Sequence, residues 1–421
     1  MKIERIHVEN FKSIRNASID FGDLNILIGR NAAGKSNLFE LFQFLKDIGE
    51  QNLENAIQLR GGVEYFRNTR IRDSKNFKLT CSFSQPERRH GGRRRIGDVE
   101  YRISSVYSTE YSIEISFSGE DFAVEEEKIK NERTLWDTED GIGDGNQIRE
   151  TTSRAENVIE RETEPINENE IDVETLESTG PRRKEISSKE SLLSLGGYPR
   201  RNFMPGLRRL KDLVIYDVDP GKIKKGTTLK GKRELEPNGE NLPLVLKEIV
   251  SSDDKEKKFL NIAGDVLPFL KDWRTDTLSD KSVFLKILEE FEDTDEEYLP
   301  ANLVSDGTIN MIVLVVILYF ENRGPIFIEE PEKSIHPSLI SKMMDMMVDS
   351  SVNSDKQIFV TSHNVELVKN ANLEQICLVA RDHDGYTEIS RPDNDSHIRE
   401  FLSEGMGLGE LYVNNILEDE L

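Results

Sequence analysis

The sequence predicts an α/β fold: a mixed sheet built around a glycine-rich loop, an antiparallel β lobe and a helical lobe. Three observations predict it. A glycine-rich turn separates a buried strand from a helix over residues 24–45. Apolar and polar residues alternate over 77–128, which is the period of strands that bury one face. Two more apolar strands, 325–328 and 358–362, end in titratable residues.

Residues 29–36 form the glycine-rich loop, Gly-Arg-Asn-Ala-Ala-Gly-Lys-Ser, and fit the phosphate-binding pattern G-x-x-x-x-G-K-[ST]. The apolar run 24–28 precedes the loop, and apolar residues at helical spacing follow it over 37–45. A chance glycine turn would lack this lysine, this serine and both flanking elements.

The chemistry of this loop follows from its residue types. Glycines permit backbone angles closed to other residues, so the loop N–H groups and the helix N-terminus point at phosphate oxygens. Lys35 adds a positive charge at the β and γ phosphates, and Ser36 offers a hydroxyl to Mg²⁺. The predicted ATP-binding residues of the loop are Gly29, Arg30, Asn31, Ala32, Ala33, Gly34, Lys35, Ser36 and Asn37.

Composition and charge limit the class of protein. The chain has 421 residues, 36% of them hydrophobic, enough for two or three domains. Its net charge of −23 provides no global positive field for nucleic acid, so any DNA contact needs a local patch. Two cysteines make neither a disulfide framework nor a metal cluster. We expect that residues 1–5 are not part of a signal peptide. The longest apolar run, 311–320, is too short for a bilayer. We therefore expect a soluble, cytoplasmic protein that does not contact membranes.

A basic run, Arg88–Arg95, interrupts the predicted antiparallel sheet and holds five arginines. Two interpretations stay open. The run is either a solvated loop that balances local charge, or a contact for DNA phosphates or an acidic partner.

Residues 131–200 differ in composition from the rest of the chain. The overlapping span 120–177 holds 20 acidic and 6 basic residues, a net charge of −14. Apolar residues are sparse there, and no heptad repeat is sustained. We expect an acidic insertion that is mobile or forms a solvated helical arm, and not a core or a long coiled coil.

Residues 201–300 are predicted to form the helical lobe. Candidate helices span 242–251, 254–270 and 282–292, and a short strand at 214–218 enters the lobe.

Three motifs follow in the last part of the chain. A Ser-Asp-Gly turn at 305–307 precedes the apolar helix predicted over 309–320, so it lies at a helix N-terminus. The strand 325–328 ends in Glu329 and Glu330, and the strand 358–362 ends in His363.

A later turn, Asp-His-Asp-Gly at 382–385, lies between two short predicted strands. Asp-Gly between strands is typical of a hairpin, so we interpret these residues as a turn and not as a metal site.

This ordered set of motifs, together with Asn-Phe-Lys-Ser-Ile at 10–14, resembles the ATPase heads of structural-maintenance-of-chromosomes (SMC), RecF and overcoming-lysogenisation-defect proteins. These are ABC-type ATPases that are not transporters. The resemblance covers roughly 1–130 and 201–421. It implies an ABC-ATPase head: a P-loop sheet, an antiparallel β lobe and a helical lobe that carries the signature turn, here with a polar acidic insertion.

The resemblance implies roles for individual residues. In the Walker B motif, Glu329 would lie beside Mg²⁺ and Glu330 would act as the general base or orient the attacking water. His363 would be the switch histidine that reaches the γ-phosphate. The predicted signature residues are Ser305, Asp306 and Gly307, with Asp306 where relatives carry glycine.

Two further assignments are less specific. Residues 334–337, Ser-Ile-His-Pro, stand in the place of the D-loop, where His336 is equally well explained as a helix cap. Gln85 is the candidate for the Q-loop glutamine.

The resemblance also implies an assembly. ATP lies between two heads in that group, and this chain carries one of each motif, so we expect a homodimer or a higher homo-oligomer. The expected domains are an N-terminal ATPase part (1–130), the acidic insertion (131–200), the helical lobe (201–300) and a C-terminal ATPase part (301–421).

The purpose of an ATP cycle has more than one interpretation. The first is a stand-alone ATPase of prokaryotic anti-phage defence that controls a separate effector, often a nuclease. The second is a RecF-like DNA-repair ATPase that binds DNA directly. A nuclease in its own right is disfavoured, because the roughly thirty residues after Arg391 are too few for the nuclease domain of overcoming-lysogenisation-defect proteins.

Overall fold

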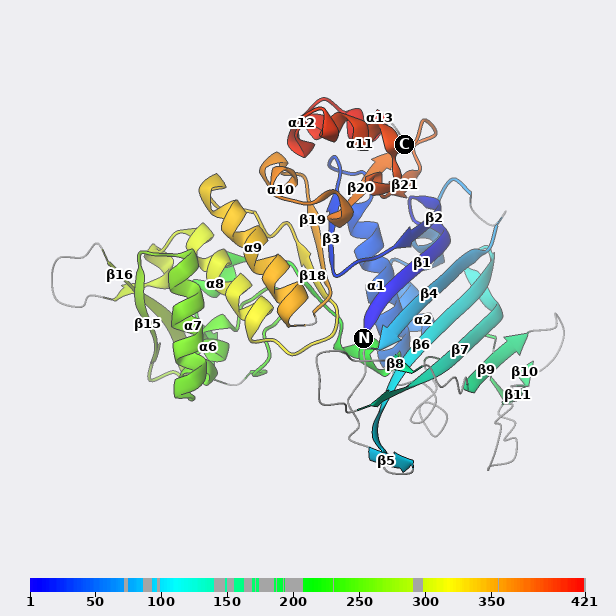
Figure 1. The fold of residues 1–421 in the computed structure, drawn as a ribbon, viewed down its shortest axis with the longest axis horizontal. Helices are drawn as coiled ribbons and strands as arrows, with labels where there is room; N and C mark the ends of the chain where they lie inside the picture. The colour runs from blue at the N-terminus through cyan, green and yellow to red at the C-terminus, as the bar shows by residue number, and fades with distance from the viewer. Residues whose placement is uncertain are drawn as a thin grey trace. The chain divides into compact units, whose positions relative to one another are not determined.

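The computed structural model describes most of the chain. It covers residues 1–71, 75–85, 93–96, 99–139, 148–149, 155–162, 169–170, 172–173, 185–186, 188–191, 193, 207–229, 231–290, 298–354 and 356–419. The chain divides into two compact units, and we describe each by itself (Figure 1). The first consists of Met1–Phe21, Asn37–Leu213 and Arg381–Ile389, and the second of Gly22–Ser36, Val214–Ala380 and Ser390–Leu421.

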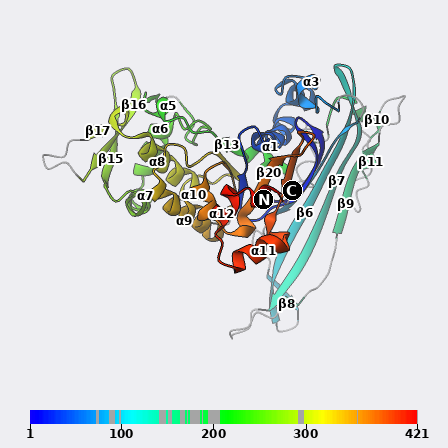
Figure 2. The ribbon, with the colours of Figure 1, turned by 90° about the horizontal axis from the view of Figure 1, so that it is seen from above.

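The first unit contains an antiparallel sheet. Its strands are β1 (Lys2–Phe11), β2 (Ile14–Asp20), β4 (Phe77–Gln85), β6 (Val99–Ser118), β7 (Asp121–Glu139), β9 (Ala155–Glu162) and β11 (Asp172–Val173), in the order β11-β9-β7-β6-β4-β1-β2. The short β5 (Arg93–Ile96) pairs with β6, β8 (Ile148–Arg149) pairs with β7, and β10 (Asn169–Glu170) pairs with β12 (Glu185–Ile186). The longest strands, β6 and β7, form one hairpin (Figure 2).

Helices of the first unit pack on this sheet through aromatic side chains. The helices are α1 (Lys35–Glu50, from Asn37 on), α2 (Leu53–Gln58) and α3 (Val63–Phe66), with a 3₁₀ turn at Leu207–Asp212. Phe66 lies at the centre of the cluster. Its ring centroid is 4.7 Å from that of Phe44 on α1, 4.9 Å from that of Phe77 on β4 and 5.2 Å from that of Phe11 on β1.

The Asn-Phe-Lys-Ser-Ile segment forms the tight turn between β1 and β2. Asn10 and Lys12 adopt the left-handed conformation, with φ of 57° and 47°. The Asn10 side chain accepts a hydrogen bond from Asn68 N (3.1 Å) and donates one to Lys75 O (2.5 Å). Ser13 Oγ lies 2.7 Å from Thr387 Oγ1 and accepts a hydrogen bond from Asn37 Nδ2. The segment therefore fixes the turn and the start of α1 by side-chain bonds.

The second unit contains a parallel sheet. Its strands are β3 (Leu24–Ile28), β13 (Val214–Tyr216), β18 (Ile326–Glu329), β19 (Ile358–Ser362) and β20 (Ile376–Arg381, to Ala380 in this unit), in the order β20-β3-β19-β18-β13. Every residue of β3 and β19 is buried, as expected for strands covered on both faces. A smaller sheet holds β14 (Thr227–Thr228), β15 (Leu270–Thr277), β16 (Ser282–Glu289) and β17 (Leu299–Pro300).

Helix α8 is the central helix of the second unit. It spans Asp306–Tyr319, and its residues from Gly307 to Leu318 are all buried, so it is apolar around its whole circumference. Figure 1 shows it between α7 and α9. The helices of this unit are α5 (Pro220–Ile223), α6 (Leu242–Val250), α7 (Asp253–Val266), α8, α9 (Pro337–Asn353), α10 (Val365–Lys369), α11 (Ser396–Ser403), α12 (Leu408–Val413) and α13 (Ile416–Asp419). Within the described part of the chain, every helix is too short or too polar to cross a bilayer.

Most predicted elements are confirmed, including the strands before the glycine loop, the antiparallel lobe and the helix at 242–251. The helix predicted over 254–270 is also present, but it ends at Val266, and Leu270 already belongs to β15. The turn at 382–385 is also confirmed, because Asp382 N donates to Tyr386 O (2.9 Å) and Gly385 N donates to Asp382 O (2.8 Å). The strand at 214–216 lies in the parallel sheet beside β18, and not merely at the entrance to a helical lobe.

Two expectations need correction. The helix expected over 282–292 is wrong, because Ser282–Glu289 forms β16 and pairs with β15. Val283, Leu285 and Ile287 alternate with less buried residues, which is the period of a strand. The helical arm expected within 131–200 is also wrong for the described residues, where β9 extends the sheet at the edge of β7.

The aromatic cluster yields a stability prediction. Phe66→Ala should lower the free energy of unfolding of the first unit by about 3–5 kcal/mol, because it leaves a cavity among rings that cannot collapse onto it. The neighbouring Tyr65 is 61% exposed, so Tyr65→Ala is a matched control with an expected effect within about 0.5 kcal/mol. Urea denaturation followed by circular dichroism measures both. Equal losses in the two variants would contradict the central role of Phe66.

Candidate nucleotide site

The parallel register brings three functional loops to one edge of the second unit's sheet. Ile28 pairs with Ser362, and Thr361 pairs with Glu329. The glycine loop, the His363 loop and the Glu329–Glu330 pair therefore leave adjacent strands β3, β19 and β18 at their carboxyl ends. Ligands of open α/β sheets bind in the crevice at this edge.

The glycine loop is held in conformations that few residues adopt. Gly34 has φ of 114°, and Ala32 adopts the left-handed region at φ 62°. A Cβ atom on Gly29 would lie 2.0 Å from Val379 O, so β20 passes directly against the start of the loop. Ala33 N donates to Arg30 O (3.2 Å) and closes the turn.

Lys35 lies at the loop, and its charged group is buried. It is 8% exposed, and its Nζ donates to Gly29 O (2.7 Å) and Arg30 O (3.0 Å). Burial lowers the pKa of Lys35, while the nearby Glu330 and Glu332 carboxylates oppose that shift. A bound phosphate would supply the negative charge that this ammonium group lacks.

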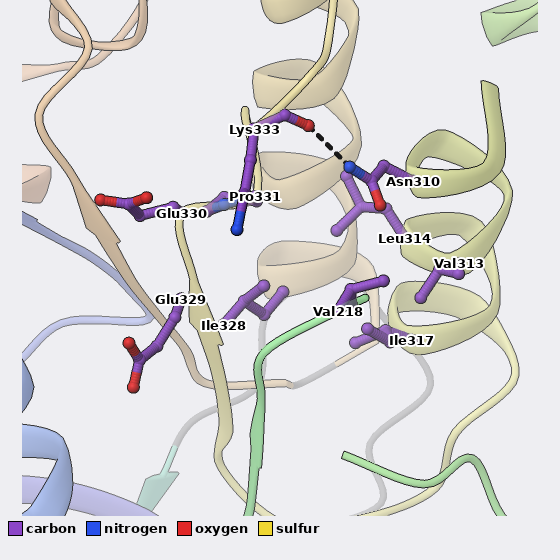
Figure 3. A pocket seen from close by; sticks show the side chains of 10 residues that line it. All are labelled: Val218, Asn310, Val313, Leu314, Ile317, Ile328, Glu329, Glu330, Pro331 and Lys333. Atoms are coloured by element: carbon purple, nitrogen blue, oxygen red, sulfur yellow. Dashed lines mark hydrogen bonds between the residues drawn. The ribbon is translucent and has the colours of Figure 1, made fainter. Parts of the chain in front are cut away.

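Glu330 and His363 lie in contact at this edge. His363 Nδ1 is 2.9 Å from Glu330 Oε1, and both side chains are partly exposed. Glu330 adopts a left-handed conformation at φ 43°, which its N–H maintains by donating to Thr361 O at 3.0 Å. Strained backbone of this kind is held only where the surroundings fix it, often at active sites. Figure 3 shows the Glu329 and Glu330 carboxylates pointing away from Asn310 and helix α8.

Glu332 is a buried carboxyl group behind this pair. It is 5% exposed, and burial raises its pKa. One of its oxygens accepts a hydrogen bond from Ser362 Oγ.

The signature turn packs against the segment that follows Walker B. Ser305 caps α8 by accepting from Thr308 N (3.1 Å), and Asp306 pairs with Lys224 (2.5 Å). A Cβ atom on Gly307 would lie 2.4 Å from Ser334 O, so only glycine fits there.

One turn further along α8, Asn310 joins the helix to the same segment. Its Nδ2 donates to Lys333 O (2.6 Å), as Figure 3 shows. The two residues lie at a small cavity lined mainly by apolar side chains of α8 and β18. The signature helix and the Walker B segment are thus fixed to each other.

The structure thus brings the glycine loop, Glu329, Glu330 and His363 to one edge, and places Ser305, Asp306 and Gly307 beside the D-loop. Arg30 Nη2 donates to Asn415 Oδ1 (2.8 Å), and the amide of Asn37 is bonded to Ser13. His336 is the N-cap of α9, which confirms the capping interpretation. Gln85 ends β4 in the first unit, and its side chain lies outside the description.

Sequence reasoning assigned no role to Asn310, Thr361, Ser362 or Glu332. Their partners lie 23 to 31 residues away in the chain. No spacing rule connects them, so only the fold identifies these contacts.

The donor set fits Mg²⁺. The Ser36 hydroxyl is exposed at the glycine loop, and the Glu329 carboxylate ends β18. Among the described residues, no group of three or more His, Cys, Asp or Glu side chains could enclose a metal. Mg²⁺ ordinarily takes one or two protein oxygens and completes its shell with water and substrate phosphates, so Ser36 and Glu329 would hold it.

Fold and site together define a P-loop ATPase domain of the ABC type. Residues 1–368 match the family described as AAA ATPase domain. The chain belongs to this family.

Individual relatives resemble shorter parts of the chain. It is 32% identical over 121 residues to structural maintenance of chromosomes protein 1 of Schizosaccharomyces pombe, which is 26% of this chain and 10% of that protein. It is 36% identical over 62 residues to an ATP/GTP phosphatase of Helicobacter pylori, which is 14% of this chain and 17% of that protein. The chain therefore matches less than a fifth of either relative's length.

Solved structures with a similar arrangement are SMC heads. One is an SMC head bound to the C-winged helix domain of ScpA, with a TM-score of 0.47, 12% identity and coverage of 93% of this chain and 98% of that one. Another is the SMC head domain from Thermotoga maritima, with a TM-score of 0.41, 12% identity and coverage of 93% and 99%.

The loop geometry predicts that adding one methyl group at Gly29 weakens ATP binding, whereas removing one at Ala32 does not. Gly29→Ala should weaken ATP binding by about tenfold or more, equal to at least ~1.4 kcal/mol, because its methyl group overlaps Val379 O. Ala32→Gly should keep affinity within about threefold, since it removes a Cβ from a left-handed position. Calorimetric titration with ATP measures both. A Gly29→Ala protein that is folded and binds ATP normally would contradict the tight packing at Val379.

Proposed function

We propose that the chain binds and hydrolyses ATP with Mg²⁺, and that each nucleotide lies between the glycine loop of one copy and the signature turn of another. The single observation that supports hydrolysis is the Glu330–His363 pair. It is a carboxylate and an imidazole 2.9 Å apart, directly after the ends of β18 and β19, and β19 pairs with the strand that precedes the phosphate-binding loop.

The roles of the residues follow from this geometry. Lys35 exchanges its bonds to Gly29 O and Arg30 O for bonds to the β and γ phosphates. Glu330 accepts a proton from the attacking water as the new bond to the γ-phosphorus forms and the bond to the leaving ADP oxygen breaks. A His363 tautomer with a proton on Nδ1 donates to Glu330 and fixes its orientation. Ser36 and Glu329 would hold Mg²⁺, which would neutralise phosphate charge when bound.

The arrangement of the motifs supports the proposal of a second copy. Each chain carries one glycine loop and one signature turn, and Ser305 and Asp306 are exposed at the N-terminus of α8. Two copies related by a two-fold axis would complete two identical sites through one self-complementary interface. This supports a homodimer or a higher homo-oligomer.

The biological role that we propose is ATP-gated control of a separate effector protein, such as a nuclease, in prokaryotic anti-phage defence. The support for this role is the resemblance to compact stand-alone heads. Isolation of the complex from its native cell, followed by mass spectrometry of co-purified proteins, tests it.

The catalytic proposal predicts that Glu330→Gln binds ATP but turns it over about 10²–10⁴-fold more slowly, because the amide keeps the shape and loses the base. ATP should then hold the variant as a dimer in light scattering. Lys35→Ala is the control: it should fail to bind ATP and stay in the nucleotide-free assembly state.

Two outcomes would overturn the proposal. Wild-type turnover in Glu330→Gln would move the base elsewhere, with Glu329 the first alternative. An ATP-bound Glu330→Gln protein that stays monomeric would exclude the shared site.

The second candidate function, a RecF-like ATPase that binds DNA, is favoured by the basic run. Residues 93–95, the described arginines of Arg88–Arg95, lie on β5, and the register puts Arg93 opposite Arg102 of β6. Residues 86–92 lie outside the description. Arginines grouped on a hairpin suit the phosphate backbone without reading bases.

This candidate predicts salt-sensitive, sequence-tolerant DNA binding that is lost in the triple variant Arg93→Ala, Arg94→Ala, Arg95→Ala. Each lost phosphate contact should reduce the slope of log affinity against log salt by about 0.9. Fluorescence anisotropy with labelled duplexes, with and without ATP, measures it. Wild-type protein that fails to bind at about 50 mM salt would exclude this function and leave the effector proposal.

A further inference from the structure

Glu332 is a buried acidic residue that the ATPase chemistry above does not use. Its side chain is 5% exposed, one oxygen accepts from Ser362 Oγ, and the other is buried with no hydrogen-bond partner among the described residues. Burying a carboxyl group with one oxygen unsatisfied is costly. An apolar side chain would fill the same space more favourably. The presence of a carboxyl group that is hydrogen-bonded to Ser362 therefore requires an explanation.

The bond fixes the loop that carries His363. Ser362 Oγ donates to Glu332 and accepts from Asn364 N (3.0 Å). Asn364 Oδ1 in turn accepts from Glu366 N (2.9 Å) and caps α10. His363 therefore lies between Ser362 and Asn364, whose side chains are both fixed by hydrogen bonds.

The turn that carries Glu330 is fixed in the same way. Lys333 N donates to Glu330 O (2.9 Å), and Ile335 N donates to Glu332 O (3.0 Å). Glu330 and Glu332 thus belong to one rigid turn, while Ser362 ends β19 and His363 follows it directly. Besides the bond from Glu330 N to Thr361 O, two pairs of side chains connect these segments: Glu332 with Ser362, which is buried, and Glu330 with His363, which is exposed.

We propose that Glu332 is a positioning residue of the ATPase, which sets the separation of the two segments through Ser362 and so holds Glu330 and His363 in contact. The buried bond excludes water and orients its partners, whereas the exposed pair alone would be loosened by solvent. The inference rests on the roles proposed above for Glu330 and His363.

Three single variants test the bond. Glu332→Ala and Ser362→Ala should each lower kcat by about 10–100-fold, because a displacement of about 1 Å at reacting groups costs up to that factor. KM for ATP should change less than about threefold, since no hydrogen bond joins either side chain to the glycine loop in the part of the chain that the structure describes. Glu332→Gln keeps an acceptor for Ser362 and should retain kcat within about threefold. Glu366→Gln, on the exposed face of α10, is the matched acidic control.

A double-variant cycle separates positioning from general stabilisation. In a His363→Ala background, Glu332→Ala should cause no further loss of rate in single turnovers, because the contact that Glu332 maintains is already gone. A merely structural role would reduce the rate by the same factor in both backgrounds and would overturn the proposal. So would a Glu332→Gln protein as slow as Glu332→Ala.

The design keeps this inference distinct from the proposed function. If Glu330→Gln and His363→Ala both turn over normally, the proposed function fails. If both are slow but Glu332→Ala and Ser362→Ala are not, only the positioning role fails. Should Glu332→Ala not fold, Ser362→Ala and Glu332→Gln still decide the question.

Discussion

The parallel register of β3, β19 and β18 is the constraint on which the site depends. Ile28 lies opposite Ser362, and Thr361 opposite Glu329, so a shift of one residue would turn either strand's side chains to the other face. Neighbouring strands lie about 4.8 Å apart, which is close enough for groups at their ends to share one phosphate chain. The buried residues of β3 and β19 fix this register, because each is covered on both faces. The strand register that packs the core of this sheet is therefore also the register that brings the proposed catalytic groups together.

A feature could be predicted from the sequence where the residues that form it lie close together in the chain. The glycine loop, the Walker B carboxylates and His363 were predictable, because each is a short pattern whose neighbours in the chain are also its neighbours in space. Strand β16 was not, because Leu285, Ile287 and Leu288 satisfy helical and extended spacings over so short a run. Its pairing with β15 decides the conformation. Ser362 and Glu332 lie 30 residues apart, so their bond depends on the β18–β19 pairing and leaves no local pattern.

Three strained backbone positions lie where the site would handle phosphate and water. Among the described residues, Ala32 in the glycine loop, Glu330 after Walker B and Ser334 in the D-loop all have positive φ without being glycine. Such conformations cost of order 1–3 kcal/mol each. The surrounding contacts offset this cost. Glu330 N donates to Thr361 O. Beside Ser334, Lys333 O accepts a hydrogen bond from Asn310, and Ser334 O itself packs against Gly307. A relaxed loop would be more stable locally but would aim the Glu330 carboxylate elsewhere.

The turn 330–335 is where these constraints meet, because it is bonded on both sides. Towards β19, Glu330 and Glu332 hold the His363 loop. Towards α8, Asn310 and the close approach of Gly307 to Ser334 O hold the signature turn. Helix α8 is buried along nearly its whole length, and a close-packed helix moves as a body rather than bending. In the proposed dimer, the signature turn of one copy faces the nucleotide of the other. A change at His363 when the γ-phosphate leaves would therefore reach the opposite site through this turn, without a separate signalling element.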